Sequence, residues 1–487
     1  MKKIKPSEEY DAVVIGSGPN GLAAGIRLSL EGLSVKIIEA KPTIGGGMRT
    51  VELMESGIFH DICSAIHPMA VSSPFLKKIP LEHFGLKWIH PTYPAAHPLD
   101  SETAVLYNQL SETAFHLGVD EKRYEAIVKP LTENWDTLSA DLLAPLRFPN
   151  HPLKMARFGF SGLQSASHFQ KNFETDRAKA LFAGMAAHSI LPLDSWATTA
   201  IALIFFTTAH TGGWPLPEGG SQKIAEAMAG YFKSLGGEIE TSNEIKNFGE
   251  IPKSKAVLFD LTPHQVLRIM GDQFPSSYRD RLSNFRYGGG AFKMDFILSE
   301  PVPWKDHHCR RAGTVHVGGT FEEIADSEKK VFDGKHSDRP FVLVAQQSLF
   351  DTTRSTNNKE TLWAYCHVPN GSTSDMSSAI ENQIERFAPG FKDTILSKQS
   401  MTTSDFEEYN ANYIGGDING GRQDIFQLFS RPVNFINPYA TPVKGVYFCS
   451  SSTPPGGGIH GMCGFHAANL SLKRDFGIKP SNSKFRI

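Results

Sequence analysis

Residues 11–21 read Asp-Ala-Val-Val-Ile-Gly-Ser-Gly-Pro-Asn-Gly, and the rest of the chain is organised around them. The apolar run Val13–Ile15 stops at a glycine, and Gly16, Gly18 and Gly21 then form G-x-G-x-x-G where helical spacing begins. This order predicts a strand that enters a helix through a glycine turn. Gly16 would permit the tight turn, and Gly18 would let a diphosphate approach the backbone and the positive end of the helix.

The residues that follow complete a βαβ unit. Pro19 suits the first helical turn because the N–H that it lacks has no partner there, and Gly32 is placed to end the helix. Residues 34–39 then alternate as a second strand. Glu39 closes that strand, where a carboxylate accepts hydrogen bonds from an adenosine ribose and disfavours a 2′-phosphate. The fingerprint alone could be an ordinary glycine turn, but with these features it favours FAD or NAD over NADP.

Three consecutive glycines follow the unit, in Ile-Gly-Gly-Gly-Met-Arg-Thr at residues 44–50. Such a run favours neither helix nor strand and marks backbone that passes close to another object. Arg49 could place a positive charge beside a diphosphate, or pair with an acid as an ordinary loop arginine.

Composition limits the choice of partners. The 487 residues suffice for two or three domain-sized cores, and Lys plus Arg total 49 against 51 acids, for a net charge of −2. No block of like charge suits a nucleic acid, so we predict no nucleic-acid partner. The polar segment of residues 1–10 leads into the first strand without an apolar signal region, which predicts a cytoplasmic protein.

Membrane and metal signals are weak. The longest apolar tract, residues 200–206, is far shorter than the ~20 residues needed to span a bilayer, so it indicates a buried helix or cavity wall and leaves a peripheral membrane contact open. Five cysteines form no C-x-x-C pair, which fits reduced thiols. In Asp-His-His-Cys at residues 306–309, adjacent side chains rarely converge on one ion, so we expect a solvated loop and no metal.

The middle of the chain has a helical pattern first, then a turn-rich segment, and then strand patterns. Residues 100–210 have a mainly helical pattern, and residues 212–221 are rich in turn formers. Ser221 is a candidate N-cap of the next helix, and residues 238–245 and 256–260 have strand patterns that indicate a return to the nucleotide domain.

A second sheet and an apolar cap are expected around these segments. Strand patterns predict a half-buried antiparallel sheet, and apolar cap residues could wall a substrate tunnel or simply form a core. The strand patterns cover residues 290–298, 314–317, 341–345 and 362–368, and the apolar cap residues are Leu142, Leu143, Phe158, Phe160, Phe169 and residues 201–206.

The end of the chain repeats the strand, glycine and helix order. A strand at residues 446–449 precedes Ser-Ser-Ser-Thr-Pro-Pro-Gly-Gly-Gly-Ile-His-Gly at residues 450–461, and a helix follows. A helix N-terminus approached through glycines can hold partial negative charge, which a reduced flavin carries at its N1–C2 carbonyl edge.

These motifs, together with Gly-Gly-Trp-Pro-Leu-Pro-Glu-Gly-Gly-Ser-Gln at residues 212–222, resemble the phytoene desaturase-like group of FAD-dependent oxidoreductases, which is related to the amine oxidases. The resemblance covers most of the chain. It implies an α/β fold with a Rossmann-like FAD-binding domain interleaved with a substrate domain, which consists of an antiparallel or mixed sheet and a helical cap. The FAD-binding domain would comprise residues 1–75, 212–285 and 430–487, the cap residues 76–211 and the sheet residues 286–429.

The same resemblance implies roles for individual residues. Lys293 is similar to the amine-oxidase lysine that holds a water near flavin N5, and Ile245 resembles a main-chain contact to adenine. A serine run, with Ser451 as a cofactor contact, stands where amine oxidases usually place an acid. The other cofactor contacts are expected at Gly16, Gly18, Pro19, Asn20, Gly21, Glu39, Ala40, Gly46, Gly47, Met48, Arg49, Gly457, Gly458, Ile459 and His460.

The predicted reaction is hydride abstraction by FAD from an apolar, polyene or lipid-like substrate, with oxygen or a quinone as the final acceptor. Lys293, His460 and His67 are the candidates for proton movement. NAD(P)H is not expected as the electron partner, because the chain has no second βαβ fingerprint and no redox cysteine pair. An amine or alcohol oxidase, a flavin-dependent isomerase and a non-catalytic FAD-binding protein stay open as alternatives, and the oligomeric state is not readable from the sequence.

Overall fold

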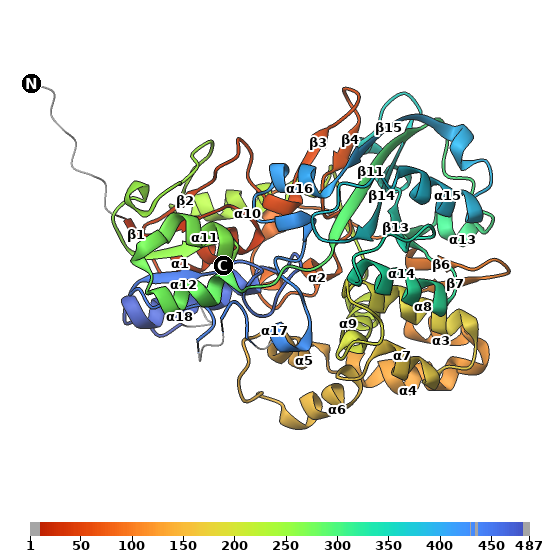
Figure 1. Ribbon diagram of the computed structural model, residues 1–487, viewed down its shortest axis with the longest axis horizontal. Coiled ribbons are helices and arrows are strands. Elements are labelled where there is room, and N and C mark those ends of the chain that lie inside the picture. The colour runs from red at the N-terminus through yellow and green to blue at the C-terminus, as the bar shows by residue number, and fades with distance from the viewer. Residues whose placement is uncertain (1–9, 429, 434–436, 481–487) are drawn as a thin grey trace, which may run out of the picture.

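A computed structural model describes residues 10–428, 430–433 and 437–480. Two sheets divide the molecule, a five-stranded sheet on the left of Figure 1 and a seven-stranded sheet on the right. The N-terminal segment on which the predicted localisation rests, residues 1–9, lies outside the described residues.

The five-stranded sheet is parallel and has the order β16-β10-β1-β2-β9. The central strand β1 and its neighbour β2 come from the start of the chain, β10 and the edge strand β9 come from the middle, and the other edge strand, β16, comes from the end. The strands are β1 (Tyr10–Ile15), β2 (Val35–Ile38), β9 (Glu238–Glu240), β10 (Ser254–Phe259) and β16 (Val446–Phe448). Three distant segments therefore build one Rossmann-like sheet, as the resemblance implied.

Helices cover both faces of this sheet. One face packs against α1 (Pro19–Ser29), α10 (Gln222–Ser234) and α18 (Met462–Asp475), and the other against α11 (Pro263–Met270) and α12 (Ser276–Ser283). The contact between α1 and α18 is so close that a Cβ added to Gly464 would lie 1.8 Å from the carbonyl oxygen of Asn20.

The seven-stranded sheet is mixed, with the order β15-β11-β14-β13-β12-β6-β7, and only its β12–β6 pair is parallel. Helix α15 covers one face, and α8, α9 and α14 cover the other. The strands are β6 (Tyr93–Pro98), β7 (Thr103–Leu106), β11 (Gly290–Leu298), β12 (Ala312–Val317), β13 (Val342–Ala345), β14 (Glu360–Val368) and β15 (Ile395–Met401).

Three sequence-based expectations for this sheet were wrong. Residues 93–106, assigned to the cap, form two of its strands, and the strand at residues 395–401 was not predicted. The strand at residues 290–298 is buried along its whole length rather than on alternate residues, because helices lie on both sides of it.

The cap consists of helices below the seven-stranded sheet in Figure 1. Leu143, Phe158, Phe169 and Phe206 are buried in cores, whereas the suggested tunnel residue Phe160 is 81% exposed. The helices are α3 (Leu110–His116), α4 (Glu121–Thr132), α5 (Trp135–Leu142), α6 (Pro152–Gly162), α7 (Ala166–Phe169), α8 (Asp176–Ala187) and α9 (Thr198–Thr211). Across the described ranges, none of the helices combines the length and apolarity required to traverse a bilayer.

Shorter elements connect these layers. They are β3 (Thr50–Glu52), β4 (Phe59–Asp61), α2 (Pro68–Val71), β5 (Trp88–Ile89), β8 (Leu216–Pro217), α13 (His307–Arg310), α14 (Phe321–Phe332), α15 (Ser377–Phe387), α16 (Thr403–Tyr409) and α17 (Ile425–Leu428).

Two local predictions are corrected as well. Ser221 does not cap α10, because its backbone is already helical and its hydroxyl donates to the carbonyl oxygen of Ser64. The strand expected at residues 238–245 ends at Glu240, so Ile245 lies in irregular backbone, where it is buried.

Candidate functional site

A cavity opens along the carboxyl-terminal edge of the five-stranded sheet and encloses about 1160 Å³, including the space at its mouth. Segments from the beginning, middle and end of the chain line it. Of the expected cofactor contacts, the lining includes Gly16, Gly18, Pro19, Asn20, Glu39, Ala40, Gly46, Gly47, Arg49, Ile245, Ser451, Gly458 and Ile459. Gly21, Met48, Gly457 and His460 are not in the lining.

Glycines bring two loops together at the start of α1. Gly16 has a φ of 101° and Gly46 a φ of 56°, which favour glycine. A Cβ on Gly46 would lie 3.1 Å from the Cα of Gly18. The wall here is bare backbone, as a diphosphate cradle requires.

Glu39 lies where the sequence placed it, at the end of β2, and its carboxylate is fixed on both sides. Oε2 accepts hydrogen bonds from the N–H (3.0 Å) and hydroxyl (2.6 Å) of Ser17, and Oε1 accepts one from the N–H of Lys41 (2.9 Å). Its side chain is held at the cavity wall in the position expected for a ribose acceptor.

Arg49 combines the two roles that the sequence left open. Its guanidinium lines the cavity and lies 3.3 Å from Oε1 of Glu39, and it also donates to the carbonyl oxygen of Thr43 at 2.8 Å. The guanidinium lies 5.2 Å from the centroid of the Tyr409 ring, which favours a cation–π contact. Arg49 therefore pairs with a buried acid of the site itself.

Asp260 is the cavity residue that the sequence analysis missed. It follows β10, and its Oδ2 accepts a hydrogen bond from the N–H of Gly21 at 2.8 Å, at the start of α1. Burial raises the pKa of this carboxyl to about 7, and nearby Glu39 adds to the effect. A signal existed, because Asp260 ends its strand pattern in the same way as Glu39.

The opposite end of the cavity is formed by the last glycine-rich segment. Asn20 donates through Nδ2 to Oγ of Ser451 at 3.3 Å, and both residues line the cavity. The hydroxyls of Ser450 and Ser452 instead donate to the carbonyl oxygens of Leu261 and Gly420. Of the three serines, Ser451 is therefore the one whose hydroxyl oxygen accepts a hydrogen bond from a cavity side chain.

The two candidate histidines are held by backbone and hydroxyl groups. Nδ1 of His460 accepts the N–H of Met462 at 3.0 Å, and Nε2 of His67 lies 2.8 Å from Oγ of Ser221. Burial lowers the pKa of each to about 4, so both rings are neutral at neutral pH. Neither ring is part of the cavity lining.

Lys293 lies on β11, is buried and is not part of the cavity lining. Its ammonium forms an ion pair with Asp295, and Asp295 Oδ1 lies 3.4 Å from Nδ1 of His60. Cys63 connects this group to the wall: burial raises the pKa of its thiol, and Lys293 is close enough to oppose the increase. The Cys63 sulfur would lie 3.9 Å from a Cβ on Gly47, which lines the cavity.

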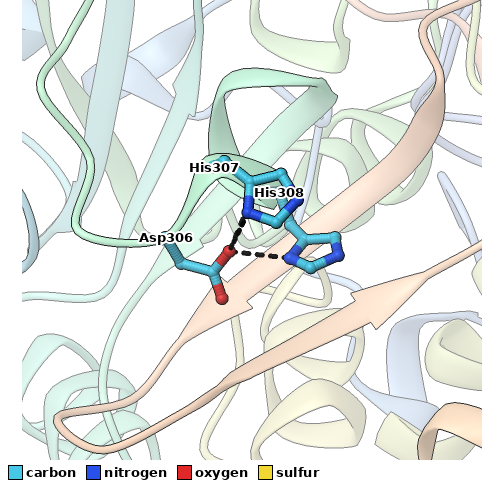
Figure 2. A group of neighbouring side chains, drawn as sticks. All are labelled: Asp306, His307 and His308. Carbon is cyan, nitrogen blue, oxygen red and sulfur yellow. Dashed lines mark hydrogen bonds and ion pairs between the residues drawn. The ribbon is translucent and has the colours of Figure 1, made fainter.

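A second group of polar side chains lies far along the chain, at the start of α13. Figure 2 shows the Asp306 carboxylate between two imidazoles, with one oxygen 2.7 Å from Nδ1 of His308 and 3.5 Å from Nδ1 of His307. The same oxygen accepts the N–H of His308 and so caps the helix. The expected loop is therefore a short capped helix, and the three side chains, which were expected not to converge, place one potential ligand atom each within 4.8 Å of one another.

Comparison with known proteins agrees with this geometry. Residues 14–78, which contain β1, α1, β2 and the glycine loop, match a family model described as an NAD(P)-binding Rossmann-like domain. The neurosporene-forming phytoene desaturase of Rhodobacter capsulatus is 22% identical, with 93% of this chain and 92% of the desaturase covered. The chain is similar to phytoene desaturases over nearly its whole length.

Other matches of this phytoene desaturase-like protein also extend over nearly its whole length. A protein of Rattus norvegicus named pyridine nucleotide-disulfide oxidoreductase domain-containing protein 2 is 24% identical, with 96% of this chain and 94% of the rat protein covered. The structure of putrescine oxidase bound to putrescine superposes with a TM-score of 0.61 at 16% identity, covering 97% of this chain and all of the oxidase. An oxidoreductase from Methanosarcina mazei superposes with a TM-score of 0.65 at 16% identity, covering 96% and 100%.

These matches confirm the predicted resemblance and fold class. The phytoene desaturase-like chain has the fold of the amine oxidases and is an oxidoreductase.

Proposed function

We propose that this protein binds FAD and uses it to remove a hydride from an apolar, polyene or lipid-like substrate, with oxygen or a quinone as the acceptor that reoxidises the flavin. The observation that carries the proposal is one cavity that extends from Glu39 and Ile245 to Gly458 and Ile459, past the glycines at the start of α1. An elongated dinucleotide fits such a cavity better than a compact ligand.

The donor set of the cavity fits the parts of FAD in order. Glu39 and the backbone near Ile245 suit the adenosine end, and the bare backbone of Gly18 and Gly46 suits the diphosphate. Asn20 is buried, and its Oδ1 has no hydrogen-bond partner among the described residues, so it can accept from a ribityl hydroxyl. When bound, FAD supplies the hydride acceptor.

Three side chains outside the cavity lining are assigned roles in holding a proton or in positioning the backbone. We assign Lys293 the role of holding a proton at Nζ, since its side-chain nitrogen forms an ion pair with Asp295 inside the protein. His460 would position the last glycine segment through its bond to the Met462 N–H. His67 would fix the start of α10 through Ser221, so we assign it no proton transfer.

An apolar substrate is supported by aromatic residues on the strand that pairs with that of Lys293. Trp363 and Tyr365, on the strand beside Lys293, belong to the core shared by the sheet and the cap, and so does Trp214. We also propose the division into an FAD-binding domain of residues 1–75, 212–285 and 430–487, with the cap and the sheet as the substrate domain.

The proposal is tested by purifying the protein and recording its flavin absorbance, then adding polyenes, lipids, amines or alcohols without oxygen. Bleaching by a polyene or lipid supports the proposed substrate class, and bleaching by amines with peroxide release in air contradicts it. A colourless protein that takes up no FAD rejects the proposal altogether.

A matched pair of lysine variants examines Lys293. We expect Lys293→Met to bind FAD normally but bleach at least tenfold more slowly, within the range of general acid–base effects. Lys305→Met is the control, because the ammonium of Lys305 bonds the carbonyl oxygen of Arg386 in an exposed setting.

A further inference from the structure

The outer surface of the cap carries apolar side chains on and beside α6, which lies at the lower edge of the molecule in Figure 1. We call these residues the α6 face. They are Leu146 (72% exposed), Phe148 (83%), Leu153 (85%), Phe160 (81%), Leu163 (44%) and Trp196 (67%).

The exposed residues of α6 follow a helical period. Leu153, Ala156 and Phe160 are exposed at intervals of three and four residues, while Phe158 and Gly162 are buried against the rest of the cap. A surface helix ordinarily turns its polar side to solvent. Helix α6 is apolar on both sides, so its outward side is suited to a second apolar environment.

The neighbouring residues are fixed in place around the helix. The buried carboxylate of Asp141 accepts the N–H groups of Asn150 (2.9 Å) and His151 (3.0 Å), and so anchors the loop that presents Leu146 and Phe148. At the other end, the N–H of Ala197 donates to the carbonyl oxygen of Leu163, which keeps Trp196 beside the end of α6. The side chains are thus displayed by an ordered surface.

Cations outnumber acids in this region, although Arg147 lies 3.7 Å from the buried carboxylate of Asp141, and Asp194 is exposed near Trp196. No Asp or Glu occurs in residues 142–173, which contain Arg147, Lys154, Arg157 and Lys171, although the whole chain has a net charge of −2. Large apolar side chains flanked by cations are the features by which proteins bind an anionic lipid surface. A symmetric dimer through the same face would bring these cations against their own copies, which disfavours a second copy as the occupant.

We propose that the α6 face docks this protein on the surface of an anionic phospholipid bilayer, with Leu153 and Phe160 among the acyl chains and Arg147 and Arg157 at the headgroups. The protein would lie on one leaflet. The proposal concerns the cap and does not depend on the cofactor or the substrate.

Vesicle sedimentation of the full-length protein tests this proposal. We expect wild type to bind phosphatidylcholine vesicles that contain about a third phosphatidylglycerol, to bind pure phosphatidylcholine at least tenfold more weakly, and to dissociate as salt rises, because screening weakens exposed charge contacts. The variant Leu153→Glu/Phe160→Glu should lose at least tenfold in binding. Leu396→Glu, at a residue that is 53% exposed on β15, should bind like wild type.

Two further measurements distinguish a loss of membrane contacts from unfolding, and the apolar contacts from the charge contacts. Circular dichroism melting of each variant checks the fold, and Arg147→Gln/Arg157→Gln, which leaves the apolar residues in place, should lose the preference for the anionic vesicles. Failure of wild type to bind either vesicle overturns the proposal. A dimer by light scattering that Phe160→Glu converts to monomer overturns it as well, in favour of a second copy on the α6 face.

Discussion

Two helices of the nucleotide domain both begin after a glycine, but the N–H groups in their first turns have different hydrogen-bond partners. Helices α1 and α18 both follow a glycine, and neither is capped by its own N-cap side chain. At α1 the N–H of Gly21 donates to the carboxylate of Asp260, whereas at α18 the N–H of Met462 donates to the ring of His460. One helix end therefore faces an acid and the other a neutral imidazole.

This difference separates two kinds of ligand environment. Backbone N–H groups that donate to a carboxylate can also donate to phosphate oxygens, so the start of α1 suits an anion. The start of α18 is already satisfied by a ring that stays neutral, so the cavity wall there is backbone from Gly458 and Ile459 with no ionised side chain of its own. In the proposed complex with FAD, the diphosphate would lie at the first end and the uncharged ring at the second.

The largest expected effect comes from separating the two helices. A Cβ on Gly464 would meet the carbonyl oxygen of Asn20, so we expect Gly464→Ala to lower the free energy of unfolding by about 3 kcal/mol through overpacking. Gly159→Ala on α6 is the control, because nothing lies within 4 Å of its Cβ position, and it should stabilise by up to about 1 kcal/mol. Urea denaturation measures both. Equal stability of the two variants would mean that the close approach of α1 and α18 is not required.

The next effect concerns the acid at α1. With a pKa of about 7, Asp260 is neutral in acid and ionised in base, where it repels a diphosphate. We expect the Kd for FAD to rise by about tenfold per pH unit above pH ~7.5, and Asp260→Asn to remove this dependence. Titration of flavin fluorescence from pH 6 to 9 provides the measurement.

The two thiols near Asp260 do not titrate in the pH range of this experiment. Burial raises the pKa values of the Cys449 and Cys463 thiols, which therefore stay protonated. Glu39→Gln should weaken FAD binding because it removes a ribose acceptor, and it should move the onset of the pH dependence to lower pH because the charge of Glu39 helps to raise the pKa of Asp260. The same slope in wild type and Asp260→Asn would show that another group titrates.

The smallest effect is expected at α18. The pKa of His460 falls from its ordinary value to about 4 on folding, so the unfolded chain takes up a proton at a higher pH than the folded chain. Stability from this group is present above pH ~6.5 and is lost as the pH falls toward 4. We expect His460→Asn to lose about 1 kcal/mol at pH 7 and to show a smaller decline in melting temperature in acid. His307→Asn, at a side chain that is 74% exposed, should behave like wild type; an identical acid response in His460→Asn would contradict the assignment.

The sequence was most informative where backbone conformation decides the structure. Glycines with positive φ and a strand-ending acid can be recognised from local order, so Gly16, Gly46 and Glu39 were placed correctly in the cavity. Asp260 was missed because its partner, Gly21, lies far away in sequence. Strands β6 and β7 were missed because their segments are short and because β6 joins the sheet by pairing with β12, which is distant in sequence. Phe160 was wrongly suggested as a tunnel residue because an apolar helical period does not tell which side meets solvent.

The sheet order of the nucleotide domain also bears on how the protein is made. Strand β16 and helix α18, both near the end of the chain, pack against β10 and α1. During synthesis the first βαβ unit leaves the ribosome long before β16 and α18 are made. Its apolar surface stays exposed until they pack against it. The domain can therefore close only after β16 and α18 have been translated, and a premature stop before β16 would yield a polypeptide with an uncovered apolar surface that is prone to aggregation and proteolysis.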